Sequence, residues 1–198
     1  MLDTSAAEPA AAADERRAVS GELEDFIAPL ALSGKPLGGS PLTDTVMSER
    51  DAKHFGPPTI VVGGLRIWVH GRQYPDTEDY WDGNWLRVTV LCGASGAEVW
   101  VSGAIIHLGE VAEWLSGTES LHQKLTGSAA LKCVEPELHV EMEMTKHGQL
   151  VMTVNITPDN LTQQHEFKFD LDQSYLPNVI RACREVLSKY PLKGTPDD

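Results

Sequence analysis

Hydrophobic and polar residues are distributed differently on the two sides of Pro57-Pro58. Beyond these prolines, hydrophobic residues alternate with polar ones over residues 65–70 and 85–92, as they do in strands that bury one face. Gly93-Ala94-Ser95-Gly96 then forms a short turn into residues 97–103. The pattern predicts an antiparallel hairpin at this point.

The spacing of the hydrophobic residues changes to that of a helix between residues 108 and 125. The residues that would face a sheet are Leu108, Val111, Leu115, Leu121 and Leu125. Gly117 interrupts this pattern, and Thr118 could cap a second start, so one bent helix and two short helices both fit the sequence.

A second series of alternating segments covers residues 129–134, 138–145, 149–156 and 165–171. A final helix is predicted over residues 175–189, where one side carries Leu176, Val179, Ile180, Cys183 and Leu187. The short connections between strands require antiparallel pairing, because parallel neighbours need a long crossover. The sequence therefore predicts an α+β fold, an antiparallel β-sheet of about six to eight strands covered by two main helices.

Residues 1–55 differ in composition from the rest of the chain. They contain Ala-rich stretches and a Gly/Pro-rich stretch at residues 34–41, which bury too little apolar surface to offset the entropy of ordering. We expect a low-complexity, mostly disordered N-terminal tail, in which one short helix could form at residues 15–27. Residues 56–198 then make a single α+β domain.

The chain is acidic, with a formal net charge of −13 and a sequence pI of about 4.9. Phosphate binding needs a basic surface, so nucleic acid is not expected as a direct partner. The acidity can serve solubility alone, or it can form a face that matches a basic protein and speeds association.

The sequence also bears on the compartment in which the protein works. No stretch has the length and apolar character of a membrane span, and the first residues lack the basic and apolar regions of a signal peptide. The cysteines, Cys92, Cys133 and Cys183, are odd in number and widely spaced, which does not suggest a disulfide framework. We therefore expect a cytoplasmic protein that does not bind membranes.

No pattern of catalytic or metal-binding residues is recognised in the sequence. The seven histidines form no HExxH motif and the cysteines no Cys-x-x-Cys motif, so no metal site is expected. Ser95 is not in a G-x-S-x-G elbow, and the glycines around it are not followed by the Lys-Ser/Thr of a P-loop. We expect no cofactor and no enzymatic activity.

Acidic and aromatic side chains are concentrated in residues 74–82, called the acidic loop below. The candidate partner-binding residues in this loop are Asp76, Glu78, Asp79, Tyr80 and Trp81. One interpretation is a solvated loop in which Asp82 fixes a turn. The other is a partner-binding patch, because aromatic side chains anchor protein interfaces and carboxylates attract a basic surface.

Two segments are the most characteristic of the domain. Asp82-Gly83-Asn84-Trp85-Leu86 is a turn that leads into a strand, and Trp85 is expected in the core. Phe167-Lys168-Phe169-Asp170-Leu171-Asp172-Gln173-Ser174-Tyr175-Leu176-Pro177 is a strand that leads into a helix. Phe167 and Phe169 are expected in the core, and Ser174 is expected to cap the helix, with Pro177 in its first turn.

These two segments resemble the WapI family of bacterial immunity proteins. The strand around Val99 and Val101, the helix after it and the end Val186-Leu187-Ser188-Lys189-Tyr190-Pro191 extend the resemblance over roughly residues 60–194. The resemblance implies a cytoplasmic, non-enzymatic protein that binds and neutralises a cognate toxin domain, often a nuclease carried by a large secreted protein. It does not identify the residues that bind the toxin.

A second hypothesis is a structural or small-ligand-binding domain. A deep apolar pocket with a few converging polar groups would favour this alternative.

Overall fold

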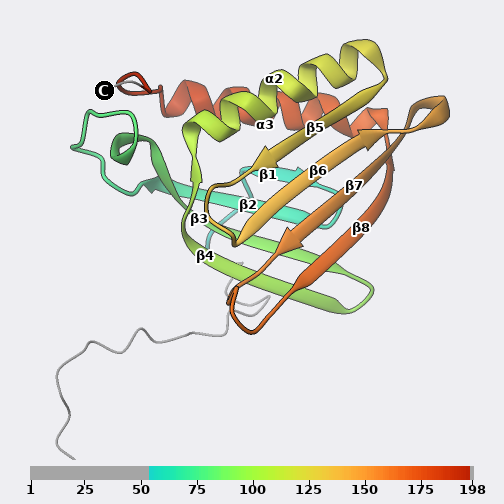
Figure 1. The fold of residues 1–198 in the computed structure, drawn as a ribbon, viewed down its shortest axis with the longest axis horizontal. Helices are drawn as coiled ribbons and strands as arrows, with labels where there is room; N and C mark the ends of the chain where they lie inside the picture. The colour runs from blue at the N-terminus through green and yellow to red at the C-terminus, as the bar shows by residue number, and fades with distance from the viewer. Residues whose placement is uncertain (1–53, 197–198) are drawn as a thin grey trace, which may run out of the picture. The chain divides into compact units, whose positions relative to one another are not determined.

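The computed structural model of the chain describes residues 54–196, which form two four-stranded antiparallel sheets and two long helices (Figure 1). The first sheet consists, in spatial order, of β1 (Ile60–Val62), β2 (Leu65–Arg72), β3 (Trp85–Ala94) and β4 (Ala97–His107). The second consists of β5 (Gly127–Lys132), β6 (Leu138–Met144), β7 (Gln149–Ile156) and β8 (His165–Asp172). The helix α2 (Leu108–Lys124) connects the two sheets, and α3 (Leu176–Lys189) follows β8.

The structure confirms the predicted α+β class and the antiparallel pairing, and its eight strands lie within the predicted number of six to eight. The eight strands are divided equally between two sheets, a division that alternation does not reveal, because alternation shows only that one face of each strand is buried. The predicted tail, residues 1–55, lies almost entirely outside the described residues, so its disorder stays a prediction.

The predicted hairpin between β3 and β4 is present. Ala94 pairs with Ala97 at its base, and the turn consists of Ser95 and Gly96, with φ angles of 52° and 86°. Two consecutive positive φ values suit the right-handed twist of the paired strands, and glycine adopts such values without steric cost.

One hydrophobic core is shared by both sheets and both helices. Its largest fully buried side chains include Trp114 of α2, Ile67 of β2, Met142 of β6 and Leu150 of β7. Phe167 is buried, as predicted, whereas Trp85 and Phe169 are only half-buried. Phe169 packs at the margin of the core, because its ring faces Gly63 and Gly64 in the turn between β1 and β2.

The helix α2 runs through Gly117 without a break, so the sequence alternative of two short helices is excluded. Thr118 does not cap a second start; it is fully buried, and its hydroxyl donates to the carbonyl of Trp114 at 2.7 Å. A Cβ atom on Gly117 would lie only 3.2 Å from the Cβ of Ala129, so the glycine allows β5 to approach the helix closely.

The transition from β8 to α3 differs from the prediction in its capping residue. The carboxylate of Asp172 accepts the backbone N–H of Ser174 at 2.7 Å and caps a short 3-10 helix before α3, whereas α3 itself begins after Tyr175 without a side-chain cap, so Ser174 is not the capping residue. Hydrogen bonds from Ser174 lower the pKa of Asp172 below its ordinary value. A short 3-10 helix, η3 (Gln173–Tyr175), precedes α3, whose first turn contains Pro177 as predicted.

Candidate partner-binding site

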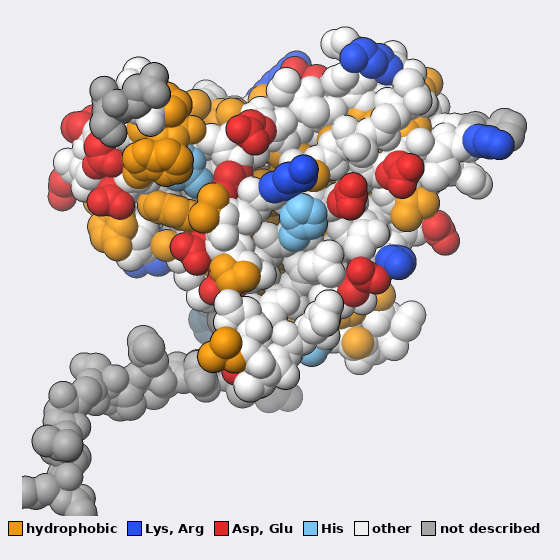
Figure 2. Space-filling view, viewed as in Figure 1, with side chains coloured by type: hydrophobic (Ala, Val, Ile, Leu, Met, Phe, Trp, Pro, Cys, Tyr) orange, Lys and Arg blue, Asp and Glu red, His pale blue; other side chains and the backbone are white. Residues whose placement is uncertain are grey.

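The acidic loop connects β2 to β3 and leads into the 3-10 helix η1 (Asp82–Asn84). Asp76, Glu78 and Trp81 are exposed to solvent, whereas Asp79 and Tyr80 are half-buried. Trp81 leaves 54% of its surface exposed. Figure 2 shows acidic and hydrophobic side chains gathered side by side at the end of the domain where Figure 1 draws this loop.

A buried histidine, His107 at the end of β4, lies under the aromatic residues of the loop. Its ring centroid is 4.9 Å from that of Tyr80, 6.0 Å from that of Trp81 and 5.4 Å from that of Trp85. Its Nε2 donates to the carbonyl of Tyr80 at 2.9 Å, and its Nδ1 accepts the N–H of Gly109 at 3.1 Å. These bonds require the neutral ring with its proton on Nε2, because a carbonyl can only accept. No motif in the sequence distinguished His107 from the other histidines.

The backbone of His107 also begins α2 through a capping box with Glu110. The His107 N–H donates to Oε2 of Glu110 at 2.8 Å, and Oε1 accepts the N–H of Val134 at 2.7 Å. Burial raises the pKa of Glu110, and the two N–H donors oppose that rise. The carboxylate therefore joins the start of α2, next to the acidic loop, to the segment after β5.

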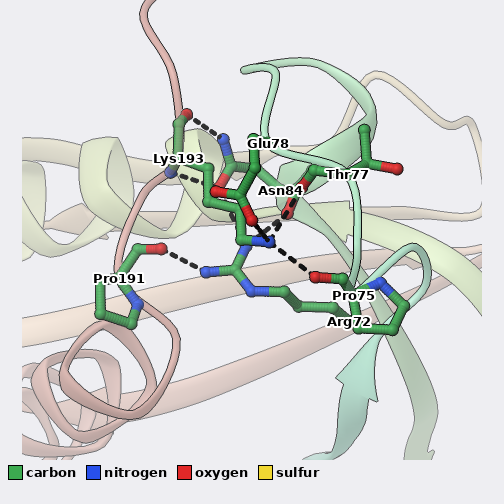
Figure 3. Close-up of polar contacts among 8 residues, drawn as sticks. Arg72, Pro75, Thr77, Glu78, Asn84, Pro191 and Lys193 are labelled. Carbon is green, nitrogen blue, oxygen red and sulfur yellow. Dashed lines mark hydrogen bonds and ion pairs between the residues drawn. The ribbon is translucent and has the colours of Figure 1, made fainter.

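The segment after α3 holds the acidic loop through one lysine (Figure 3). The ammonium of Lys193 donates to the carbonyls of Pro75 and Thr77 at 2.7 and 2.9 Å, and it forms an ion pair with Glu78 at 2.9 Å. The side chain of Lys193 is 17% exposed, whereas that of Glu78 is 79% exposed. The ammonium thus has three partners in the loop and little contact with water.

A fully buried asparagine, Asn84, connects the same segment to the end of the loop. Its Nδ2 donates to the carbonyls of Tyr80 and Lys193, each at 2.8 Å, and its Oδ1 accepts the N–H of Lys193 at 3.0 Å. Arg72 donates to the same Oδ1 at 3.1 Å and also to the carbonyl of Pro191. All the hydrogen-bonding capacity of the amide is used, so Asn84 determines the fold of the loop and is not available to a partner.

The four carboxylates of the acidic loop have different roles. Glu78 is engaged by Lys193, and the carboxylate of Asp79 accepts the backbone N–H of Asp82 at 2.8 Å. Within residues 54–196, the side chains of Asp76 and Asp82 form no hydrogen bond or ion pair. The turn therefore uses the side chain of Asp79, and the carboxylate of Asp82, which the sequence suggested for the turn, is free.

Two other kinds of site can be assessed within the same range. No group of three or more His, Cys, Asp or Glu side chains in the described part of the chain could hold a metal ion. A groove of about 690 Å³ lies between α2 and α3, and its arginines are already paired, Arg184 with Glu119 at 2.6 Å and Arg181 with Glu185 at 3.0 Å. The groove is open to solvent and its arginines are engaged by carboxylates, so it differs from the deep pocket with converging polar groups that a small-ligand domain would need.

None of the helices that the structure describes is long and apolar enough to cross a membrane.

Comparison with known proteins identifies one family. The model of the immunity protein WapI-like family matches residues 61–191, which include the acidic loop. No curated protein matches the chain. Among solved structures, the plant transcriptional regulator PBF-2 matches with 8% sequence identity and a TM-score of 0.40. The match covers 66% of this chain and 79% of the PBF-2 chain. A likeness at this TM-score carries no argument about function.

Proposed function

Because the chain belongs to the WapI-like immunity protein family, we propose that it is a non-enzymatic immunity protein that binds and neutralises a cognate toxin domain. We propose further that the toxin is a nuclease and that the two proteins meet in the cytoplasm. The three cysteines are free thiols, and Cys92 and Cys183 are buried, which is compatible with a reducing compartment.

The observation that carries the proposal is the combination of free carboxylates and an exposed aromatic side chain in the acidic loop. Asp76 and Asp82 have no side-chain partner within the described residues, and Trp81 lies between them in the sequence with more than half of its surface exposed. A nuclease is basic where it holds phosphates, so free carboxylates would attract it. The indole of Trp81 would supply contact area and a face for a guanidinium group.

The five candidate residues then divide into two groups. Asp76 and Trp81 would touch the toxin directly, together with Asp82. Glu78, Asp79 and Tyr80 would contribute mainly through the shape of the loop, because each already forms a hydrogen bond inside the protein.

The test uses two double variants that each remove two negative charges from exposed positions. The first, Asp76→Asn with Asp82→Asn, changes the acidic loop; the second, Glu141→Gln with Glu143→Gln, changes the exposed face of β6. The partner is a catalytically inactive C-terminal domain of any polymorphic toxin whose gene is found next to the gene for this protein. Association rates are measured over a range of salt concentrations, and protection is scored as survival on co-expression with the active toxin.

We expect the loop variant to associate about 5–10-fold more slowly at low salt and to show a weaker salt dependence, while the β6 variant behaves as wild type. Both variants should keep the thermal midpoint of the wild type, because exposed charges contribute little to stability. An unchanged rate for the loop variant together with a slower rate for the β6 variant would move the interface to the second sheet. No binding or protection by the wild type would refute the immunity function for this toxin.

A further inference from the structure

The structure also indicates how the acidic loop keeps its shape. We infer that Lys193 is a positioning residue, which holds residues 75–78 in the conformation that meets the toxin. The inference rests on the proposed function of the loop. Lys193 itself lies just beyond residue 191, where the family match ends.

The first argument is the small number of hydrogen bonds that the loop forms within itself. Among the described residues, the one backbone–backbone hydrogen bond of residues 74–78 is from the N–H of Thr77 to the carbonyl of Tyr74, and at 3.4 Å it is long. The next internal contacts begin at Asp79, whose carbonyl accepts the N–H of Gly83 at 3.2 Å. The stretch around Asp76 therefore depends on bonds to another part of the chain.

The second argument is that Lys193 supplies those bonds. An ammonium group has three donors, and Pro75, Thr77 and Glu78 accept all three at 2.7–2.9 Å. The two carbonyls belong to the residues immediately before and after Asp76, the carboxylate that is free to meet a partner. Figure 3 shows these acceptors converging on one nitrogen atom from the loop, while the backbone of Lys193 is held by Asn84.

The third argument concerns strength. Hydrogen bonds to a charged group are stronger than neutral ones, and the 17% exposure of the Lys193 side chain reduces screening by water. Without the ammonium, residues 75–78 would sample several conformations. For a partner that binds only one of them, the affinity would then be multiplied by the fraction of time that the loop spends in that conformation.

The experiment compares Lys193→Met with Lys189→Met, which removes the same charge from the C-terminal turn of α3. Lys189 lies over the ring of Tyr190, at 5.2 Å from its centroid, and within residues 54–196 it forms no hydrogen bond or ion pair with the loop. Hydrogen exchange is measured without toxin at the amides of Thr77, Asp82 and Gly83, which donate hydrogen bonds within the loop, with the amides of β6 and β7 as the control for folding. The affinity for the inactive toxin domain is measured next, at several salt concentrations.

For Lys193→Met we expect loop amides that exchange about tenfold faster and a Kd about tenfold higher, equivalent to about 1.4 kcal/mol. The salt dependence of binding should not become weaker, because Asp76 and Asp82 remain and the carboxylate of Glu78 loses its ion-pair partner. Lys189→Met should change neither quantity. Equal loop exchange or equal Kd in the two variants would overturn the inference.

A second variant covers the case in which Lys193→Met fails to fold. Glu78→Ala removes one of the three acceptors and should speed loop exchange about threefold; an unchanged exchange rate would overturn the inference.

The proposed function and the role of Lys193 are tested by different results. A wild type that does not bind the toxin refutes that function, whereas a wild type that binds and a Lys193→Met variant that binds equally refute only the role of Lys193.

Discussion

Truncation of two phenylalanines on β8 tests how the two sheets pack together. Phe167 pairs with Val154 and Phe169 with Met152, so both rings point from β8 toward the core side of the second sheet. Phe167 is 9% exposed, whereas Phe169 is half-buried and covers the glycine turn between β1 and β2. The two positions share a strand and a residue type, so the comparison isolates the effect of burial.

The expected cost follows from the surroundings of each ring. Truncation of a fully buried phenylalanine to alanine costs about 3–5 kcal/mol, through lost transfer free energy and the cavity left behind. We expect about 4 kcal/mol for Phe167→Ala. Phe169→Ala should cost about 2 kcal/mol, because part of the ring is already solvated and water can fill the space next to Gly63 and Gly64.

Urea unfolding followed by tryptophan fluorescence gives both free energies, and an unchanged m-value would show that the variants unfold in the same two-state manner. The order of the two values is the sharper result. If Phe169→Ala cost as much as Phe167→Ala, the contact between β8 and the first sheet would be a central part of the core. If Phe169→Ala cost less than about 0.5 kcal/mol, the result would refute the conclusion that the packing of Phe169 on the turn stabilises the protein.

Three other predictions concern stability. Gly64→Ala should destabilise the protein by about 3 kcal/mol or more, because the new Cβ would lie 2.1 Å from the carbonyl oxygen of Gly93; an unchanged thermal midpoint would contradict this. The folded-state pKa of Glu110 is raised, so its contribution to stability should fall as pH rises from its ordinary pKa through the raised value, and Glu110→Gln should lack this change. Urea unfolding of the two proteins over this pH range checks the sign, and a constant difference between them would refute it. Deletion of residues 1–50 should leave the thermal midpoint nearly unchanged, since their composition predicts little burial, and a loss of several degrees would show that they contribute to the core.

The acidic loop illustrates the limit of reasoning from residue types. Its composition was sufficient to select it as a candidate interface, because acidic and aromatic residues are concentrated there. Composition could not show, however, which of its carboxylates are bonded within the protein and which are free. The assignment of Asp79 to the turn and of Glu78 to an ion pair depends on the backbone N–H of Asp82 and on Lys193, and Lys193 is 115 residues from Glu78 in the sequence.

The helices and strands of this protein follow from local patterns in its sequence. Periods of two and of about three and a half residues indicate which side of a strand or helix is buried, and short turns indicate antiparallel pairing, because both depend on neighbouring residues. The α+β class, the hairpin at Ser95-Gly96 and the buried stripe of α3 were predicted on this basis.

The cover of each buried face and the pairing of polar groups depend on contacts between distant parts of the chain. A buried face is compatible with many partners, so alternation could not reveal that the strands form two sheets around one core. The continuity of α2 through Gly117 depends on the close approach of β5, and the shape of the acidic loop depends on Lys193 and Asn84. These contacts join residues far apart in the chain, and their free energy arises only when folding brings such residues together and removes them from water.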